Sequence, residues 1–337
     1  MKYIKPYFYD DFKCKCDKCT DTCCAGWEVD IDSDSYSIYK SVSGDFGKRL
    51  NDSIDVTDGQ PCFKLDKNDR CVFLDHNGLC DIYSNLGEEY LCEICSEHPR
   101  FYDFFDGVTE IGLGLCCERV CELLFETDKP VTFESFESFE DSDNADTNED
   151  DEIYFSIREK CFEIIQNRNE SLNMRIEKLL HYSIYIQKEM FSDSKNIKKN
   201  KNRRAVFSEV INLFSETEPI NDEWTLYIND IKDNFVKIFD YCDNVEVNKY
   251  EYEQMLTYML YRHFMQSRYN GNILSVVAFC IASIMFIYLC DCKTFYEKKS
   301  VEFSDRINIV KLWSKQIEYS EENTQLLYDK SENIFFT

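Results

Sequence analysis

The chain has 337 residues, of which 64 are acidic and 38 basic, so its formal net charge is −26. A protein that binds nucleic acid needs a basic face to displace phosphate counterions, and we therefore expect no nucleic-acid partner. The hydrophobic fraction of 44% is enough for a real core, and 10 glycines with 5 prolines exclude a collagen-like or Pro/Gly-rich disordered chain.

Cysteine is the most informative residue type, because 13 of the 18 cysteines lie within the first 121 residues. Residues 1–19 contain no apolar run of the length found in signal peptides, so we expect a cytoplasmic protein. In a reducing compartment such a density of thiols indicates metal or cluster binding. The alternative is a secreted scaffold held by disulfides.

The N-terminal segment FKCKCDKCTDTCCAGW places five cysteines within eleven residues. Thiolates this close together repel one another unless a cation neutralises them, and soft sulfur ligands favour zinc or iron–sulfur clusters. Three further groups of cysteines follow along the chain. The members of the four groups are Cys14, Cys16, Cys19, Cys23 and Cys24; Cys62, Cys71 and Cys80; Cys92 and Cys95; and Cys116, Cys117 and Cys121.

The spacing of these groups leaves both kinds of centre open. The sequence DHNG at 75–78 predicts a turn that presents Cys80 after a chain reversal. Irregular spacings and adjacent cysteine pairs are not typical of zinc fingers, whereas clusters gather ligands from distant segments. His98 is either a further ligand or a hydrogen-bonding residue. The run Cys-x3-Cys-x2-Cys of radical S-adenosylmethionine enzymes is absent.

After the cysteines the composition changes. Residues 134–152 are rich in Ser, Glu and Asp and contain no basic residue, which predicts a linker or exposed loop. From about residue 153 apolar side chains recur at spacings of three and four, the period of amphipathic helices. Such stretches are 228–238, 255–264 and 305–317. We find no strong alternating pattern that would predict strands.

Residues 273–290 form a run of 18 uncharged, mostly apolar positions, which is long enough to span a membrane. No second such run and no flanking cationic cluster accompanies it. We therefore expect the central, fully buried helix of a bundle rather than a membrane span.

The sequence predicts a mainly α protein, in which an irregular Cys-rich, metal- or cluster-binding N-terminal region precedes an all-α helical domain. The expected domains are a Cys-rich cluster-binding domain at 1–125, an acidic linker at 126–152 and a helical domain at 153–337.

In its first 125 residues the chain resembles the flagellin lysine-N-methylases of the FliB type, within the wider group of zinc- or iron-chelating CxxCxxxCC proteins. The resemblance rests on short motifs around the cysteines. These motifs are FKC at 12–14, TCCAGW at 22–27, CVFL at 71–74, GLCDI at 78–82, LG at 86–87, Cys95 with His98, Pro99 and Arg100, and LCCE at 115–118.

The resemblance implies a set of eight metal ligands. Five other cysteines of the region lie outside the family's pattern, which more often has Tyr where this chain has His98 and Pro where it has Cys117. The implied ligands are Cys14, Cys19, Cys23, Cys24, Cys71, Cys80, Cys95 and Cys116.

The resemblance also implies a function: transfer of a methyl group from S-adenosylmethionine to lysines of flagellin or another lysine-bearing surface protein. The implied cofactor is an iron–sulfur cluster of the 4Fe-4S type, with zinc as the alternative. The sequence identifies no catalytic base and no residue that binds S-adenosylmethionine. Two functions from other classes stay open, a metal-binding interaction or maturation factor without methyltransferase activity and an electron-transfer protein.

Overall fold

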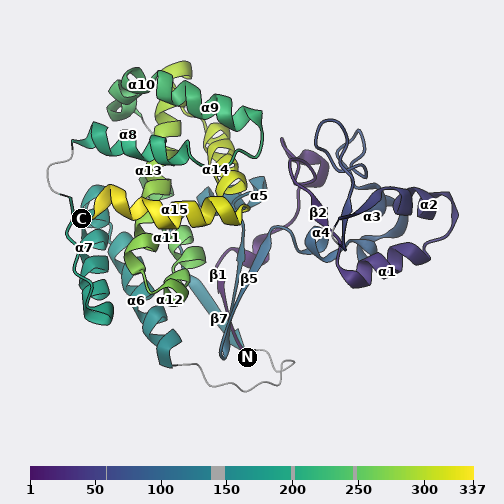
Figure 1. Cartoon of the computed structure of the whole chain (residues 1–337), viewed down its shortest axis with the longest axis horizontal. Coiled ribbons are helices and arrows are strands. Elements are labelled where there is room, and N and C mark those ends of the chain that lie inside the picture. Colours follow the sequence, from purple (N-terminus) through teal and green to yellow (C-terminus); the bar gives the residue numbers. More distant parts are fainter. Residues whose placement is uncertain (58, 138–148, 199–201, 246–248) are drawn as a thin grey trace. The chain divides into compact units, whose positions relative to one another are not determined.

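The computed structural model describes the chain except residues 58, 138–148, 199–201 and 246–248 (Figure 1). It contains two compact units, which are described separately. The helical unit comprises Met1–Asp11, Tyr102–Cys116 and Val120–Thr337, and the Cys-rich unit comprises Phe12–Phe101 and Cys117–Arg119.

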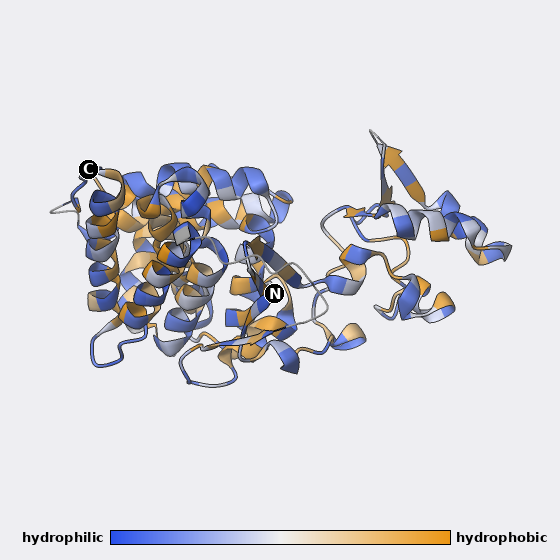
Figure 2. Ribbon diagram, turned by 90° about the horizontal axis from the view of Figure 1, so that it is seen from below, coloured by the Kyte–Doolittle hydropathy of each residue, from blue (hydrophilic) through white to orange (hydrophobic). Residues whose placement is uncertain are grey.

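Most of the helical unit consists of α-helices of 5 to 26 residues, joined by short connections. In Figure 2 hydrophilic and hydrophobic residues alternate along these ribbons, as expected of helices that bury one face. The helices are α5 (Glu118–Phe125), α6 (Glu149–Ile165), α7 (Leu172–Phe191), α8 (Arg203–Phe214), α9 (Asp222–Asp233), α10 (Phe235–Tyr241), η4 (Cys242–Asn244), α11 (Lys249–His263), α12 (Gln266–Asn270), α13 (Ile273–Lys298), α14 (Phe303–Ile317) and α15 (Glu321–Phe335).

A four-stranded sheet of order β5-β6-β1-β7 joins the start of the chain to a later segment. Strand β1 (Lys2–Pro6) pairs in parallel with β6 (Val108–Leu113) and antiparallel with β7 (Phe133–Glu137), while β5 (Arg100–Phe105) lies at the edge. The Tyr261 hydroxyl of α11 approaches the carbonyl oxygens of Ile4 (2.9 Å) and Ile111 (3.0 Å). These strands are an element that the sequence pattern did not predict.

Helix α13 is the centre of the helical unit and contacts α7, α8, α10, α11, α14 and α15 (Figure 1). It begins at Ile273, where the Asn272 side chain accepts a hydrogen bond from the Ser275 amide. It is the one described helix that is long and apolar enough to cross a membrane, and 89% of its apolar window is buried inside the protein. Such burial is what a central core helix requires, as the sequence predicts.

The predicted helical stretches are present, with one interruption. The stretches 255–264 and 305–317 fall largely in α11 and α14. The stretch 228–238 is divided between α9 and α10, because Asn234 leaves helical geometry and its side-chain amide donates to Asp230. The first apolar residues of this stretch, Ile228 and Ile231, are nevertheless buried.

The Cys-rich unit contains short elements around a small apolar core. The elements are η2 (Cys16–Lys18), β2 (Val29–Asp30), α1 (Ser33–Ser41), α2 (Gly44–Asp52), β3 (Ile54–Thr57), β4 (Gln60–Phe63), α3 (Asp81–Leu86), η3 (Glu88–Tyr90) and α4 (Glu93–Glu97); η1 (Tyr9–Asp11) precedes them in the helical unit. The strands form an antiparallel sheet of order β2-β4-β3.

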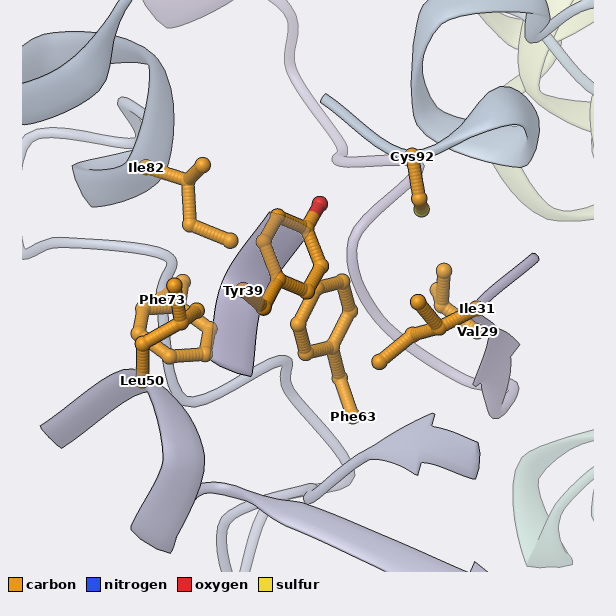
Figure 3. Packing of buried hydrophobic residues seen from close by; sticks show 8 residues of the cluster. All are labelled: Val29, Ile31, Tyr39, Leu50, Phe63, Phe73, Ile82 and Cys92. Atoms are coloured by element: carbon orange, nitrogen blue, oxygen red, sulfur yellow. The ribbon is translucent and has the colours of Figure 1, made fainter. Parts of the chain in front are cut away.

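The core of the Cys-rich unit is one cluster, in which the Tyr39 ring packs beside Phe63 and Ile82 (Figure 3). The Tyr39 hydroxyl donates to the carbonyl of Tyr90 at 2.7 Å. Partly buried hydrophobic residues, among them Trp27, Cys71, Cys80 and Cys95, pack against this cluster. The buried members are Val29, Ile31, Tyr39, Leu50, Phe63, Phe73, Ile82 and Cys92.

The fold class is mainly α, with a Cys-rich region that contains small strands followed by a helical domain, as the sequence predicts. The domain bounds at 125 and 152 stay a prediction. The middle of the expected acidic linker, 138–148, lies outside the described residues; β7 lies before it and α6 begins after it.

Burial of α13 predicts the effect of a charge placed on it. Ala278 is 0% exposed, so Ala278→Asp should lower the free energy of unfolding by about 3 kcal/mol or more, because no partner is present for the carboxylate. Tyr185→Asp on α7, at a position 57% exposed, is the control and should change stability little. Urea unfolding followed by circular dichroism measures both; equal stability of the two variants would contradict the buried position of α13.

Candidate metal centre and a buried polar network

The first group of cysteines lies on irregular backbone at the start of the Cys-rich unit. The Sγ atoms of Cys14 and Cys16 are 3.9 Å apart, and the Cys16 amide donates to Cys14 Sγ at 3.4 Å. The Cys23 thiol is hydrogen-bonded to Cys24, which is the main reason that its pKa is raised. The Trp27 indole N–H donates to the Cys23 carbonyl at 2.9 Å and so fixes the ring beside this segment.

The second group is presented by the turn that the sequence predicts. The Asp75 carboxylate accepts the amides of Asn77 and Leu79, both at 2.8 Å, and Gly78 has φ +79°, which favours glycine. Leu74 and Cys80 then face each other in an isolated antiparallel bridge. The Cys71 amide donates to the Cys24 carbonyl at 2.8 Å, which brings the first group next to the second.

Helix α4 carries the third group. The Asp32 carboxylate accepts the amides of Ser35 and Glu93, at 2.8 and 2.9 Å, and so holds the start of both α1 and α4. The Cys95 thiol is hydrogen-bonded to Cys92, and this bond, followed by burial, raises the pKa of Cys95. Cys92 Sγ in turn donates to the Asp30 carbonyl at 3.8 Å.

Burial makes two further thiols of the Cys-rich unit harder to ionise. Burial raises the pKa of Cys19 to about 11, with the charges of Glu118, Cys117 and Cys14 adding to the rise. Burial also raises the pKa of Cys71 to about 12, with Cys24, Cys80 and Cys92 as charged neighbours. A bound cation removes this repulsion, and its uptake displaces the thiol protons.

This donor chemistry suits zinc or the iron of a cluster, because every clustered ligand is a sulfur atom. As the side chains stand in the described part of the chain, no three Cys, His, Asp or Glu side chains converge on one point. Hydrogen-bonded thiol pairs are present instead, and binding sites of this class commonly form only with the metal.

Seven of the eight predicted ligands belong to one compact unit, without converging on one point. Cys14, Cys19, Cys23, Cys24, Cys71, Cys80 and Cys95 belong to the Cys-rich unit, whereas Cys116 belongs to the helical unit. Cys62 lies in β4 opposite Asp30 of β2; burial, followed by the charges of Glu28, Asp30 and Asp55, raises the pKa of Cys62. The His98 ring packs 5.9 Å from that of Trp27. The ligand set itself stays a prediction.

The helical unit contains a second concentration of functional groups, centred on the fully buried Glu318 at the end of α14. Its carboxylate contacts His263 Nε2 at 2.9 Å and Arg262 Nε at 3.4 Å, and accepts from the hydroxyls of Tyr258, at 3.2 Å, and Ser314. Burial alone raises the pKa of Glu318, but the Arg262 charge and these hydrogen bonds lower it overall. Burial lowers the pKa of His263, which is therefore neutral at pH 7.

Gly114 lies against the same network. A Cβ atom on this residue would be 2.4 Å from the Tyr319 hydroxyl and 3.1 Å from Arg262 Nη1, so a larger residue here would have to displace the Tyr319 side chain. The Tyr319 hydroxyl is hydrogen-bonded to Cys116, and the Leu115 amide donates to the Tyr258 hydroxyl at 3.3 Å. The segment before α5 is therefore fixed to α11 and to the residues that follow α14.

Strands β5 and β6 contribute two carboxylates. Glu110 forms a bidentate pair with Arg158 in which both side chains are buried. Burial, followed by the charge of Glu110, raises the pKa of Asp103 to about 6, although Arg262 and Arg158 oppose the rise. The network thus contains three carboxylates and two guanidinium groups, and its net charge is −1 when Asp103 is ionised. The carboxylates are those of Asp103, Glu110 and Glu318, and the guanidinium groups those of Arg158 and Arg262.

Sequence reasoning did not find this network. Its members come from 103–114, 158, 258–263 and 314–319, and no spacing connects segments so far apart. The sequence feature that points to the network is Gly114. A glycine allows close packing at its own position, but it does not identify the residues that pack against it.

Comparisons with known proteins account for both parts of the chain. Residues 15–110 match a family described as a zinc- or iron-chelating domain with a CxxCxxCC motif, so the Cys-rich part is similar to domains of that family. Residues 158–337, more than half of the chain, match the FliB lysine N-methylase C-terminal domain. The chain belongs to the family that this domain defines.

Individual relatives are distant. The flagellar biosynthetic protein FliU of Salmonella muenchen is 26% identical over 130 residues, 34% of this chain and 72% of the relative. Lysine-N-methylases of Salmonella choleraesuis and Salmonella typhimurium are each 22% identical over 203 residues, 55% of this chain and 47% of the relative. The chain thus spans about half the length of these lysine-N-methylases. No solved structure matches the chain.

The small core of the Cys-rich unit predicts that metal removal loosens that unit first. Treatment of anaerobically purified protein with a strong chelator should open 12–101 to protease, while the extensive core of the helical unit protects 153–337. Limited proteolysis with mass mapping measures this. Cys23→Ser should mimic the chelator, and Cys62→Ser is the control, because Cys62 lies outside the cysteine pattern of the family. Equal cleavage of both regions would contradict a local role for the metal.

Proposed function

We propose that this protein transfers methyl groups from S-adenosylmethionine to lysine side chains of flagellin, or of another lysine-bearing surface protein. The observation that carries the proposal is the match of 158–337 to the FliB lysine N-methylase C-terminal domain. Two relatives are named lysine-N-methylases and a third is named a flagellar biosynthetic protein, which supports both the reaction and the substrate class. The reaction takes place in the cytoplasm, before export of the substrate.

The reaction needs a neutral lysine amine and accurate positioning. The amine lone pair attacks the methyl carbon as the carbon–sulfur bond breaks, and the bonding pair returns to sulfur. The ammonium proton must leave beforehand, so the enzyme has to accept a proton near neutral pH. Alignment of amine, methyl group and sulfur supplies much of the remaining acceleration.

The polar network of the helical unit provides groups suited to this task. Its excess negative charge favours a cationic partner, and both the lysine ammonium and the sulfonium are cations. Asp103 is half-buried and has a pKa of about 6, which suits a general base near neutrality. Arg158 and Arg262 have carboxylate partners of their own in Glu110 and Glu318, so Asp103 is not required for their neutralisation. We assign the role of general base to Asp103.

The Cys-rich unit takes the metal-binding role in this proposal, with an iron–sulfur cluster of the 4Fe-4S type, and zinc as the alternative. The ligands proposed from the family pattern are the cysteines named above, seven of which lie in this unit. Held by thiolates, such a centre supplies cross-links between segments that are distant in sequence. The segment at 14–24 contributes no residue to the apolar cluster, whereas 71–80 and 92–95 contribute Phe73 and Cys92.

The net charge of −26 assists the encounter with a lysine-bearing partner at modest ionic strength. The charge does not select flagellin, because any basic surface experiences the same attraction. Selection among lysines therefore depends on contacts at the site.

The deciding experiment is incubation of metal-loaded protein with S-adenosylmethionine and flagellin of the same organism. We expect mass spectrometry to detect added methyl units on lysines, with formation of S-adenosylhomocysteine. Transfer to a different surface protein but not to flagellin would keep the reaction and remove the substrate. No transfer to any lysine-bearing substrate by a metal-loaded, folded protein would favour a metal-binding interaction or maturation factor.

Asp103 gives the proposal a residue-level test. Asp103→Asn should lower methyl transfer about 100-fold or more, and the wild-type rate should fall as pH drops below about 6, where Asp103 is protonated.

The same variant should keep its fold. Because the pKa of Asp103 in the folded protein is above its value in the unfolded chain, ionisation of Asp103 disfavours the folded state as pH rises from about 4 to 6. The amide variant should therefore be no less stable at pH 7. The exposed Asp106→Asn is the matched control. Activity of Asp103→Asn equal to that of the control would remove Asp103 from the mechanism.

A further inference from the structure

Strand β5 lies at the edge of the four-stranded sheet, and its two faces differ in chemistry. In the described part of the chain it neighbours a single strand, β6 (Figure 1). Residues 102–105 of β5 belong to the helical unit. Successive side chains of a strand point to opposite faces, so Asp103 shares one face with Phe105, and Tyr102 shares the other with Phe104.

The face that carries Asp103 is turned towards α6. The Phe105 ring packs edge-to-face on that of Phe155 in α6, with the ring centroids 5.3 Å apart, and Phe105 is buried. Arg158, also on α6, is one of the charges that act on Asp103. Asp103 therefore lies where the polar network meets the edge of the sheet.

The opposite face of β5 presents aromatic rings to solvent. Phe104 is 72% exposed, a larger fraction than for any other large hydrophobic side chain among the described residues. Its ring stacks on that of Tyr102, with centroids 6.4 Å apart and planes inclined by 14°. An apolar side chain so exposed on an edge strand offers a surface for pairing with another strand.

The two edges of this sheet are protected differently. Strand β7, at the other edge, carries the exposed Glu134 and Glu137, and charged side chains discourage strand pairing. Between 102 and 105 the one charged residue of β5 is Asp103, which faces α6. An inward charge of this kind disfavours an apolar strand, because pairing would bury the carboxylate without a partner. It favours a strand that brings a cation.

We propose that β5 binds an extended, lysine-bearing segment of the protein substrate, which pairs with it as an additional strand. The substrate lysine lies opposite Asp103, and its two neighbours lie on the face of Phe104 and Tyr102. Residues directly opposite each other on paired strands have Cβ atoms about 5 Å apart, so the lysine side chain is long enough for its amine to reach the Asp103 carboxylate.

This arrangement divides affinity from selection. Main-chain hydrogen bonds hold the segment whatever its sequence, while Asp103 selects the lysine and the two rings favour apolar residues beside it. The inference rests on the methyl-transfer function proposed above and specifies how that site takes its substrate.

The first test is a scan of backbone N-methylation in a synthetic flagellin peptide, centred on a lysine that the full-length, metal-loaded protein methylates. A strand paired along one edge uses the N–H groups of alternate residues. Binding, measured by fluorescence anisotropy, should therefore weaken about fivefold or more at every second position and little at the positions between. Equal effects at neighbouring positions, or no effect at any position, would overturn the pairing.

The second test needs no methyl transfer. A photo-reactive benzoyl-phenylalanine in place of Phe104, in the full-length, metal-loaded protein, should cross-link to flagellin monomers at residues adjacent to lysines. The same group in place of Leu226, which is 69% exposed on α9, is the control and should give no such pattern. Cross-links at Phe104 without methyl transfer would support the binding edge and remove the proposed reaction. Methyl transfer without these cross-links would keep the reaction and overturn the binding edge.

A pair of substitutions tests the aromatic face separately. Phe104→Ser should raise the KM for flagellin about tenfold, because the contact of the ring with the substrate is lost, and Phe104→Tyr should restore it. Leu226→Ser, at a position of similar exposure, should leave the KM unchanged. Both positions are on the surface, so circular dichroism should show the wild-type fold. A KM of Phe104→Ser equal to that of Leu226→Ser would overturn the role of the ring.

Discussion

A buried charge must have a partner, and the two units meet this constraint by different means. In the helical unit carboxylates pair with guanidinium groups of the same chain. In the Cys-rich unit a hydrogen bond between thiols raises the pKa of Cys23 and that of Cys95, and lowers that of Cys92, the partner of Cys95. Ionisation of both thiols of such a pair would place like charges side by side, and a bound cation would relieve this repulsion. The same constraint explains why apolar packing alone does not define this unit.

Paired charges also determine how the helical unit is assembled. Glu110 with Arg158 joins β6 to α6, Glu253 with Arg175 joins α11 to α7, and Glu251 with Arg306 joins α11 to α14. Buried pairs of this kind contribute little net stability but penalise alternative packings strongly, because a misplaced helix leaves a charge unpaired. Helix α11 carries two of these carboxylates, Glu251 and Glu253. It also carries Tyr258, Arg262 and His263, which contact Glu318, so the same helix contributes to the packing of the unit and to the polar network.

The sequence predicted those features that depend on local pattern. Helices α11, α13 and α14 follow from apolar spacing, and the turn before Cys80 follows from Asp75 and Gly78. Strand β6 was missed because it buries Glu110 among apolar residues and pairs in parallel with β1, about a hundred residues earlier. The crowding of thiols was visible in their spacing. The position of Cys117 beside the first group was not, because it depends on the pairing of Glu118 with Lys15 and Thr20, about a hundred residues earlier in the chain.

Helix α5 is where the chain passes from one compact unit to the other. Its first residue, Glu118, follows Cys117 and belongs to the Cys-rich unit, while Val120 and Leu124 are buried in the helical unit. Gly114, three residues before Cys117, lies against Tyr319 and Arg262 of the polar network. Two separate sets of contacts therefore constrain the backbone before and after Cys117: the close packing of Gly114 in the helical unit, and the shielded bonds of Glu118 to Lys15 and Thr20 in the Cys-rich unit.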